Sequence, residues 1–425
     1  MRTNLASAPS SPSPSRLLWA TLLCALWVLA SCTVGEKNGG EPGKDGLDGT
    51  PTGPVTVVLW HSYREAEQVA LNQVVDQFNA THADIKLETL QIPHEAYADK
   101  ITTAIPHDNG PDIFIFAHDR IGAWAEADII ESVSSWATTE HLRSYERSTV
   151  LALVYKKALY GLPLAFKSVV LFYNKDLVPT PPETDEDMIA IAKANTDIAD
   201  RRYGLVYENT QLYFTAPFLH GFGGAVMNMD GDVQLDSPES AAGLQFCRDL
   251  LTKHQVVPAD VNSNLVTTLF NSGKAAMVIN GPWFRGEISD GVRWGVAPLP
   301  VVKSTGMALA PYLGSEAVLL SKRSPHKAQA YEVMQYLAGD ESAKIRMTVG
   351  GQSVAYKAAW EEVEVAEDMR VFRKQLDHVV VMPNSARMNA VWGPTNQAIH
   401  KVVKDGEAPR KVVAEANARI EASLE

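Results

Sequence analysis

An acid and a guanidinium follow an apolar run in residues 110–120, which read GPDIFIFAHDR. The run 113–116, bounded by a Gly-Pro turn and by polar residues, is typical of a buried strand in an α/β sheet. Ligands of such sheets bind at the carboxyl ends of the strands, so Asp119 and Arg120 are predicted to bind polar groups of a ligand. The alternative is a surface ion pair at a helix start, which would contribute little energy.

Motifs for catalysis or metal binding do not stand out. Ser272-Gly273-Lys274 lacks the upstream glycine of a phosphate loop, and the sequence contains no GxSxG, HExxH or CxxC. His118 next to Asp119 is not by itself a metal site. No catalytic residue, metal site or cofactor is therefore predicted.

A secreted glycoside hydrolase is the enzyme alternative, and it would need two carboxylates, one of them with a raised pKa. Glu65 follows Arg64, and Asp119 precedes Arg120. A neighbouring arginine stabilises the ionised carboxylate and disfavours its use as a general acid. The sequence therefore favours a protein that is not an enzyme.

The remaining elements indicate an α/β chain of two domains. Residues 55–60 and 85–90 read as strands, and residues 66–79 and 96–105 as helices. An apolar strand at 168–173 precedes a new set of elements that begins at Pro181-Pro182, and a first crossover between domains is expected in this region. About 370 residues after Pro54 exceed one typical core, so a ligand cleft between two domains is expected.

Charge and hydropathy exclude two classes of protein. The net charge of −12 and the dispersed basic residues argue against nucleic-acid binding. After the first 31 residues, no apolar segment approaches membrane-spanning length, so transport through a bilayer would need other proteins.

The first 54 residues have the pattern of a targeting signal followed by a flexible tether. An apolar run at 17–29 is followed by Leu29-Ala30-Ser31-Cys32, which has the pattern of a bacterial lipoprotein signal. We expect a signal peptide at 1–31, lipidation of Cys32 and a flexible polar tether at 32–54; the alternative is an ordinary secreted protein. Cys24 would be lost with the signal, and Cys247 lies on the apolar face of a helical pattern as a small buried residue.

Five blocks together resemble the periplasmic maltose/maltodextrin-binding proteins, which are components of ABC importers. The blocks are residues 110–120, 162–177 (LPLAFKSVVLFYNKDL), 213–217 (YFTAP), 270–283 (FNSGKAAMVINGPW) and 382–392 (MPNSARMNAVW). They occur in the order of that family and cover most of the chain after about Pro54.

This resemblance implies a two-lobed α/β periplasmic-binding-protein fold of type II, with a mixed sheet flanked by helices in each lobe. Residues 55–166 and 316–365 would form the N-terminal lobe, and residues 167–315 and 366–425 the C-terminal lobe. The implied function is capture of maltose or maltodextrin-like sugars by lobe closure and delivery to permease subunits with their ATPase. The protein would be a monomer, periplasmic or at the cell surface, held to a bacterial membrane through Cys32.

The resemblance also implies a set of ligand-binding residues. Flat aromatic rings cover the faces of a pyranose, while carboxylates and guanidinium groups bind its hydroxyls. Simple packing is the alternative for each aromatic residue. The implied set is Asp119, Arg120, Gln211, Tyr213, Phe214, Phe116, Trp283 and Trp392, together with Ser62, Arg64, Glu65 and Lys167.

Some of these positions depart from the family pattern. Ser62, Arg64 and Glu65 stand where the family presents Asn, Asp and Lys, and Lys167 replaces a Glu. Gln211 replaces a carboxylate, and residues 393 and 396 are Gly and Asn where the family has Tyr and Arg, which would leave a roomier pocket. Either Lys167 pairs with Glu65 and keeps similar chemistry, or the ligand is another sugar, such as a trehalose-like disaccharide or another oligosaccharide.

Overall fold

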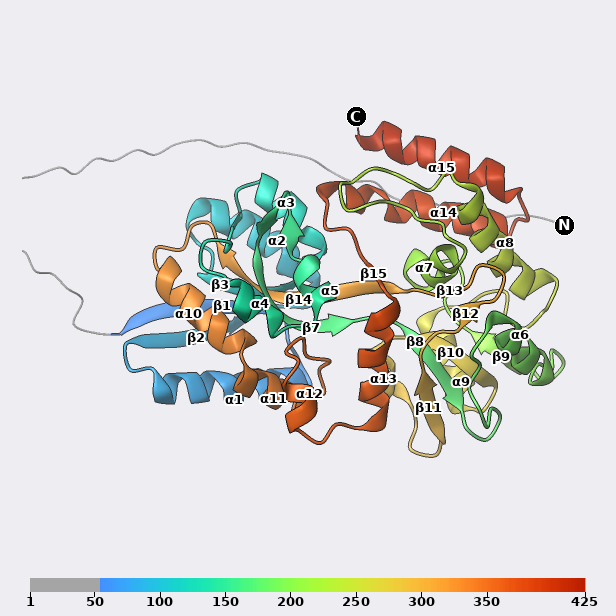
Figure 1. Ribbon diagram of the computed structural model, residues 1–425, viewed down its shortest axis with the longest axis horizontal. Coiled ribbons are helices and arrows are strands. Elements are labelled where there is room, and N and C mark those ends of the chain that lie inside the picture. Colours follow the sequence, from blue (N-terminus) through green and yellow to red (C-terminus); the bar gives the residue numbers. More distant parts are fainter. Residues whose placement is uncertain (1–53, 425) are drawn as a thin grey trace, which may run out of the picture. The chain divides into compact units, whose positions relative to one another are not determined.

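The computed structural model describes residues 54–424 (Figure 1). The predicted signal peptide at 1–31, the lipidation site Cys32 and nearly all of the tether at 32–54 lie outside the described residues. Within residues 54–424, no helix combines the length and the apolar character needed to cross a membrane.

A mixed seven-stranded sheet is the centre of the first lobe, with the order β15-β14-β3-β1-β2 and with β4 and β7 also paired to β14. β1 is parallel to β2 and β3, whereas β14 is antiparallel to β3, β4 and β7. The strands are β1 (Val55–His61), β2 (Ile85–Gln91), β3 (Ile113–Ala117), β4 (Ile130–Glu131), β7 (Gly161–Lys167), β14 (Tyr312–Ser321) and β15 (Val380–Val381). The first three strands predicted from apolar runs are thereby confirmed.

Helices pack against this sheet through apolar faces. α1 (Glu65–Thr81) buries Leu71, Val74 and Phe78, which recur with helical spacing and face the strands. The helices of this lobe are α1, α2 (His94–Ala104), α3 (Ile121–Glu126), α4 (Thr139–Arg143), α5 (Arg147–Leu151), α10 (Lys327–Ala338) and α11 (Asp340–Thr348). The helices predicted at 66–79 and 96–105 are confirmed as α1 and α2.

A second mixed sheet has the order β11-β8-β10-β9 and a separate core. Its strands are β8 (Val170–Asn174), β9 (Tyr203–Val206), β10 (Ala275–Asn280) and β11 (Trp294–Ala297). The helices of this lobe are α6 (Asp185–Ala194), α7 (Leu212–Gly221), α8 (Pro238–Thr252), α9 (Ser263–Asn271), α14 (Trp392–Val403) and α15 (Pro409–Leu424). Cys247 of α8 is fully buried, as the apolar pattern predicted.

Two strands mark where the chain passes between the sheets. β7 belongs to the first sheet and β8 to the second, so the chain crosses between Lys167 and Val170. β14 lies beside β7 (Figure 1), and its first residues pair with β15 while its later residues pair with β3 and β7. A third apolar cluster joins this region to α12 (Ala359–Glu362) and α13 (Glu367–Gln375). Two short pairs complete the strands: β5 (Val154–Tyr155) with β6 (Ala158–Leu159), and β12 (Val301–Val302) with β13 (Met307–Ala308).

Candidate functional site

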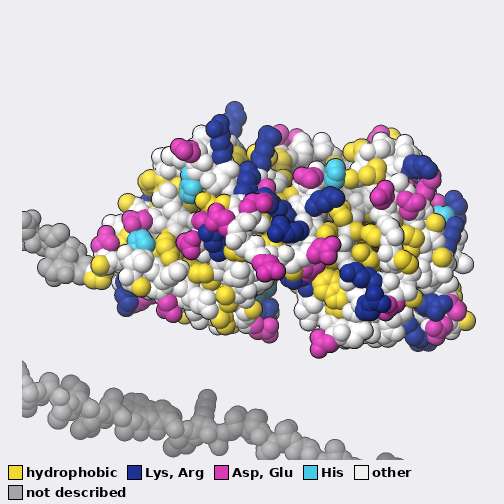
Figure 2. Space-filling view, turned by 60° about the horizontal axis from the view of Figure 1, so that its bottom comes forward, with side chains coloured by type: hydrophobic (Ala, Val, Ile, Leu, Met, Phe, Trp, Pro, Cys, Tyr) yellow, Lys and Arg dark blue, Asp and Glu magenta, His cyan; other side chains and the backbone are white. Residues whose placement is uncertain are grey.

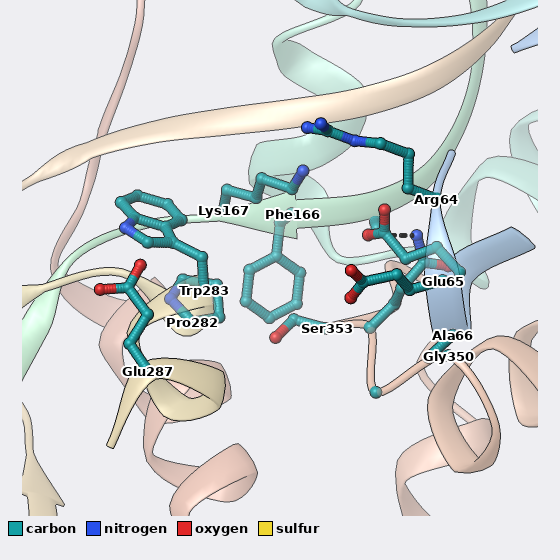
Figure 3. Close-up of a pocket in the computed structure, with 14 residues that line it drawn as sticks. Arg64, Glu65, Ala66, Phe166, Lys167, Pro282, Trp283, Glu287, Gly350 and Ser353 are labelled. Carbon is teal, nitrogen blue, oxygen red and sulfur yellow. Dashed lines mark hydrogen bonds between the residues drawn. The ribbon is translucent and has the colours of Figure 1, made fainter. Parts of the chain in front are cut away.

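A cavity of about 610 Å³ is lined by residues of both lobes (Figure 3). The first lobe contributes the start of α1 at residues 64–67, the end of β7 at residues 165–167 and the segment 350–353 after α11. The second lobe contributes Pro282, Trp283 and Glu287 from a short 3₁₀ helix after β10. This volume lies within the usual range for small-molecule sites.

Trp283 forms the aromatic wall of the cavity. β10 ends at Asn280, and Gly281 leads the chain into the 3₁₀ helix that carries the indole. A Cβ on Gly281 would lie 2.1 Å from the indole, so the glycine makes room for the ring. The indole is 42% exposed, which is unusual for so large an apolar side chain. Its exposed face can cover an apolar face of a ligand.

Two further predicted aromatic residues extend this wall. The ring centroids of Tyr213 and Trp283 are 6.2 Å apart, and those of Tyr213 and Phe214 are 5.5 Å apart in an edge-to-face arrangement. Both residues are in the first turn of α7 and are half-buried. Tyr213 packs near Trp283 and Phe214 packs against Tyr213, but neither lines the cavity itself.

Replacing Trp283 by alanine is expected to weaken ligand binding by about 1–3 kcal/mol, because the aromatic face and its buried area are lost. Calorimetric titration with a sugar of the class that the resemblance implies would measure the change in Kd. Thermal unfolding should change little, since the indole is 42% exposed in the free protein. An unchanged Kd would show that Trp283 does not contribute to ligand binding.

Arg64 and Glu65 line the cavity on the side away from Trp283, and Lys167 lies between Trp283 and Arg64, as Figure 3 shows. The sequence-based alternative that Lys167 pairs with Glu65 is wrong: among the described residues, the Lys167 ammonium lies 3.7 Å from the carboxylate of Glu316. Glu65 instead points its exposed side chain into the cavity region from a backbone with φ of 48°. A non-glycine residue with positive φ is uncommon and is found disproportionately at functional sites.

Two acidic residues of this region were missed by the sequence analysis. Glu67 lines the cavity, accepts a hydrogen bond from Gln352 Nε2 at 3.1 Å, and has a pKa raised by burial and by Glu316. Glu316 is the one charged residue in β14, and its side chain is 13% exposed. A lone carboxylate in the apolar run YLGSEAVLLS was the signal that could have indicated it.

Asp119 and Arg120 lie where predicted, in the turn that follows β3, but they do not line this cavity. Their charged atoms are 3.8 Å apart and both side chains are partly exposed. The buried His118 fixes this turn: its Nδ1 accepts from the Ser315 amide at 3.0 Å, and its Nε2–H donates to the Met382 carbonyl at 2.8 Å.

The expected effect of Arg120 on Asp119 is corrected by the structure. Burial raises the pKa of the Asp119 carboxyl, and the opposing effects of His118 and Arg120 are smaller. Arg120 does lower the pKa of this carboxyl, but burial raises it by more, so the net shift is upward.

The remaining predicted residues also lie outside the cavity lining. Gln211 accepts a hydrogen bond from Asn396 at 3.0 Å, which joins the start of α7 to α14. Trp392 begins α14 and lies edge-on to Tyr312 at 6.5 Å. Phe116 packs on the first core beside Trp124, and the Ser62 hydroxyl is 3.4 Å from His94 Nδ1.

The charges around the site are of both signs. Arg64 and Lys167 line the cavity together with Glu65, Glu67 and Glu287. On the face drawn in Figure 2, basic and acidic side chains are likewise interspersed. Within residues 54–424, no group of three or more His, Cys, Asp or Glu side chains could hold a metal ion. This arrangement suits a ligand with an apolar face and many hydroxyl groups.

Two α/β lobes with a ligand-sized cavity lined by both define a two-lobed binding protein of type II. The chain belongs to the bacterial extracellular solute-binding protein family, whose family model matches residues 64–344. It is similar to a maltotriose-binding protein of Pyrococcus abyssi, with 28% identity over 82% of this chain and 78% of that protein.

Two further comparisons agree with this assignment. A maltooligosaccharide ABC transporter solute-binding lipoprotein of Streptococcus pneumoniae is 25% identical over 74% of this chain and 77% of that protein. The crystal structure of a cyclo/maltodextrin-binding protein with maltotetraose superposes with a TM-score of 0.82 at 27% identity, covering 88% of this chain and 99% of that one.

Proposed function

We propose that this protein captures maltooligosaccharides for an ABC importer. The observation that carries the proposal is the half-exposed Trp283, which lines one cavity together with Lys167 and Arg64 of the other lobe. The similar proteins named for maltotriose, maltooligosaccharides and maltodextrin support this choice of sugar. Aromatic stacking would bind the sugar faces, and the charged side chains would bind the hydroxyls.

Binding would proceed by lobe closure. Ligand contacts from both lobes stabilise the closed state over the open one and so shift the population toward it. Asp119, Arg120, Gln211, Trp392, Phe116 and Ser62 are proposed to join the site on closure. The lobes are proposed to comprise residues 55–166 with 316–365 and residues 167–315 with 366–425. The loaded protein, as a monomer, would then dock on permease subunits.

The protein is proposed to act as a carrier and not as an enzyme. Incubation with maltotriose, followed by chromatography of the sugars, should show no product. Appearance of glucose or maltose would favour the glycoside hydrolase instead.

Anchoring through a lipid on Cys32 is proposed for the full chain, on the exterior side of a bacterial membrane. The lipoprotein name of the Streptococcus pneumoniae relative supports it. Cells labelled with a radioactive fatty acid should yield labelled protein, and the Cys32→Ser variant should carry no label. Label that persists in the variant would contradict the assignment.

The sugar itself is tested by calorimetry of residues 55–425 with maltose, maltotriose, trehalose and a disaccharide without glucose. We expect micromolar binding of maltose or maltotriose and much weaker binding of the other two. Because Lys167 and Arg64 depart from the family pattern, another oligosaccharide is the second candidate. Preference for trehalose or for the sugar without glucose would favour that candidate and contradict the first.

A further inference from the structure

Glu316 occupies a position that ordinarily excludes a charge. It lies in the middle of β14, paired with Ala117 of β3 on one side and with Ala165 of β7 on the other. The two small neighbours leave space for a carboxylate. The register with β7 also shifts between Glu316 and Ala317, and such a bulge re-aims the side chain it carries. The 13% exposed side chain is directed to two specific partners.

The two carboxylate oxygens of Glu316 contact two different residues, one that lines the cavity and one that directly precedes a lining residue. One oxygen accepts a hydrogen bond from the hydroxyl of Tyr63, and the other lies 3.7 Å from the ammonium of Lys167. Tyr63 is 4% exposed and stands in the loop after β1, directly before Arg64, which lines the cavity. Lys167 is 47% exposed, so its ammonium can contact both Glu316 and a ligand.

The surrounding groups keep Lys167 and Tyr63 protonated. The pKa of Lys167 is raised, first of all by Glu316, and the pKa of Tyr63 is raised by burial and then by Glu316, so that both remain donors. Glu67, Arg346 and Tyr97 also face the cluster. Removing one partner from such a set leaves the other charge uncompensated. This loss destabilises the folded protein by more than the intact pair stabilises it.

We propose that Glu316 is a positioning residue of the cavity, which fixes the Lys167 ammonium and, through Tyr63, the loop of Arg64 to receive the hydroxyls of an uncharged sugar. Glu316 does not itself contact the ligand. The choice of maltotriose as probe rests on the proposed function, whereas the contacts of Glu316 do not. Because Glu316 compensates its charge, Lys167 acts as a hydrogen-bond donor and not as the counter-ion of an acidic ligand.

The test is a double-mutant cycle of Glu316→Gln and Lys167→Met, followed by calorimetry with maltotriose. Glu316→Gln should weaken binding by about tenfold, which corresponds to loss of a charged hydrogen bond. In the Lys167→Met background the same substitution should weaken binding less, because the ammonium is absent and only the contact through Tyr63 remains to be lost. Equal weakening in both backgrounds would overturn the proposal.

The matched control is Glu131→Gln. Glu131 lies in the same sheet, is 19% exposed, and pairs with Lys322 and Lys327 at 3.1 and 2.6 Å, but none of these three lines the cavity. Its loss should leave maltotriose affinity unchanged. Tyr63→Phe is the second variant, in case Glu316→Gln folds poorly; it removes one donor to Glu316 and should also weaken binding. An unchanged affinity of Tyr63→Phe would overturn the role of the loop.

A measurement without sugar separates this proposal from the proposed function. Lysines of the free protein are labelled with methyl groups, and Lys167 is assigned by NMR through its absence in a Lys167→Arg variant. The pKa of Lys167 should fall in Glu316→Gln and stay unchanged in Glu131→Gln. If the parent protein does not bind maltotriose, the proposed function fails, and an unchanged Lys167 titration then overturns the positioning role as well.

Discussion

Replacing Trp360 by alanine is expected to lower the free energy of unfolding by about 3–5 kcal/mol, the usual range for a buried tryptophan. Trp360 is fully buried, its indole N–H donates to the Val354 carbonyl at 2.9 Å, and its ring stacks near Phe166 at 6.1 Å between centroids. The substitution leaves both a cavity and an unpaired carbonyl. Urea unfolding followed by circular dichroism would measure the loss.

Two other tryptophan variants serve as controls. Trp360→Phe keeps most of the apolar contacts and should cost less than the alanine variant. Trp283→Ala removes a side chain of the same type that is 42% exposed, and should cost less than about 1 kcal/mol of stability. If Trp360→Ala were as stable as Trp283→Ala, the third apolar cluster would contribute little to the stability of the protein.

This cluster matters for function because of where its members come from. Phe166 precedes Lys167 at the end of β7, and Met347 is in α11, whereas Phe172 belongs to β8 of the second sheet. Trp360 therefore packs at the passage between the lobes, beside residues that line the cavity. We expect milder substitutions here, such as Trp360→Phe, to alter the rate of ligand binding as well as stability.

Much of the fold could be predicted from local patterns. The run 113–116 after a Gly-Pro turn indicated β3, and the helical spacing of Val69, Leu71, Val74, Val75 and Phe78 indicated α1, because both depend on which faces of one element are apolar. Val69 of this pattern is nevertheless exposed. The place of β14 could not be predicted in this way. Its pairing of Ala317 with Phe116 joins residues 201 positions apart, and strand periodicity does not identify the partner strand.

The site was only partly predictable for the same physical reason. Trp283 was indicated by a matched block that ends in a glycine-containing turn, and the structure places it at the cavity wall. The sequence left open whether Lys167 pairs with Glu65, and Lys167 instead lies near Glu316, because an ion pair depends on tertiary contacts. The register shift at Glu316 and the hydroxyl of Tyr63 decide which carboxylate reaches the ammonium, and neither has a local sequence pattern.

Stability is expected to fall steeply as the pH drops below about 6.5, because burial lowers the pKa of His61 and of His220 to about 4. The unfolded chain, with histidine pKa values near 6.5, binds protons that the folded state excludes, so stability is full above that pH and is lost on acidification. Each histidine should cost about 2 kcal/mol between pH 7 and pH 5. Urea unfolding at a series of pH values measures the slope.

The contribution of one histidine is isolated by His220→Gln. His220 is 5% exposed and its Nδ1–H donates to the Ala310 carbonyl at 2.6 Å, a bond that the glutamine amide can replace. Glu67 and Asp119 have pKa values raised by burial, so their contribution to stability grows as the pH falls. Both residues are present in the parent and in the variant, so this contribution cancels in the difference. The variant should therefore lose about 2 kcal/mol less than the parent between pH 7 and pH 5. Parallel slopes for the parent and His220→Gln would mean that the buried imidazole is protonated in the folded protein.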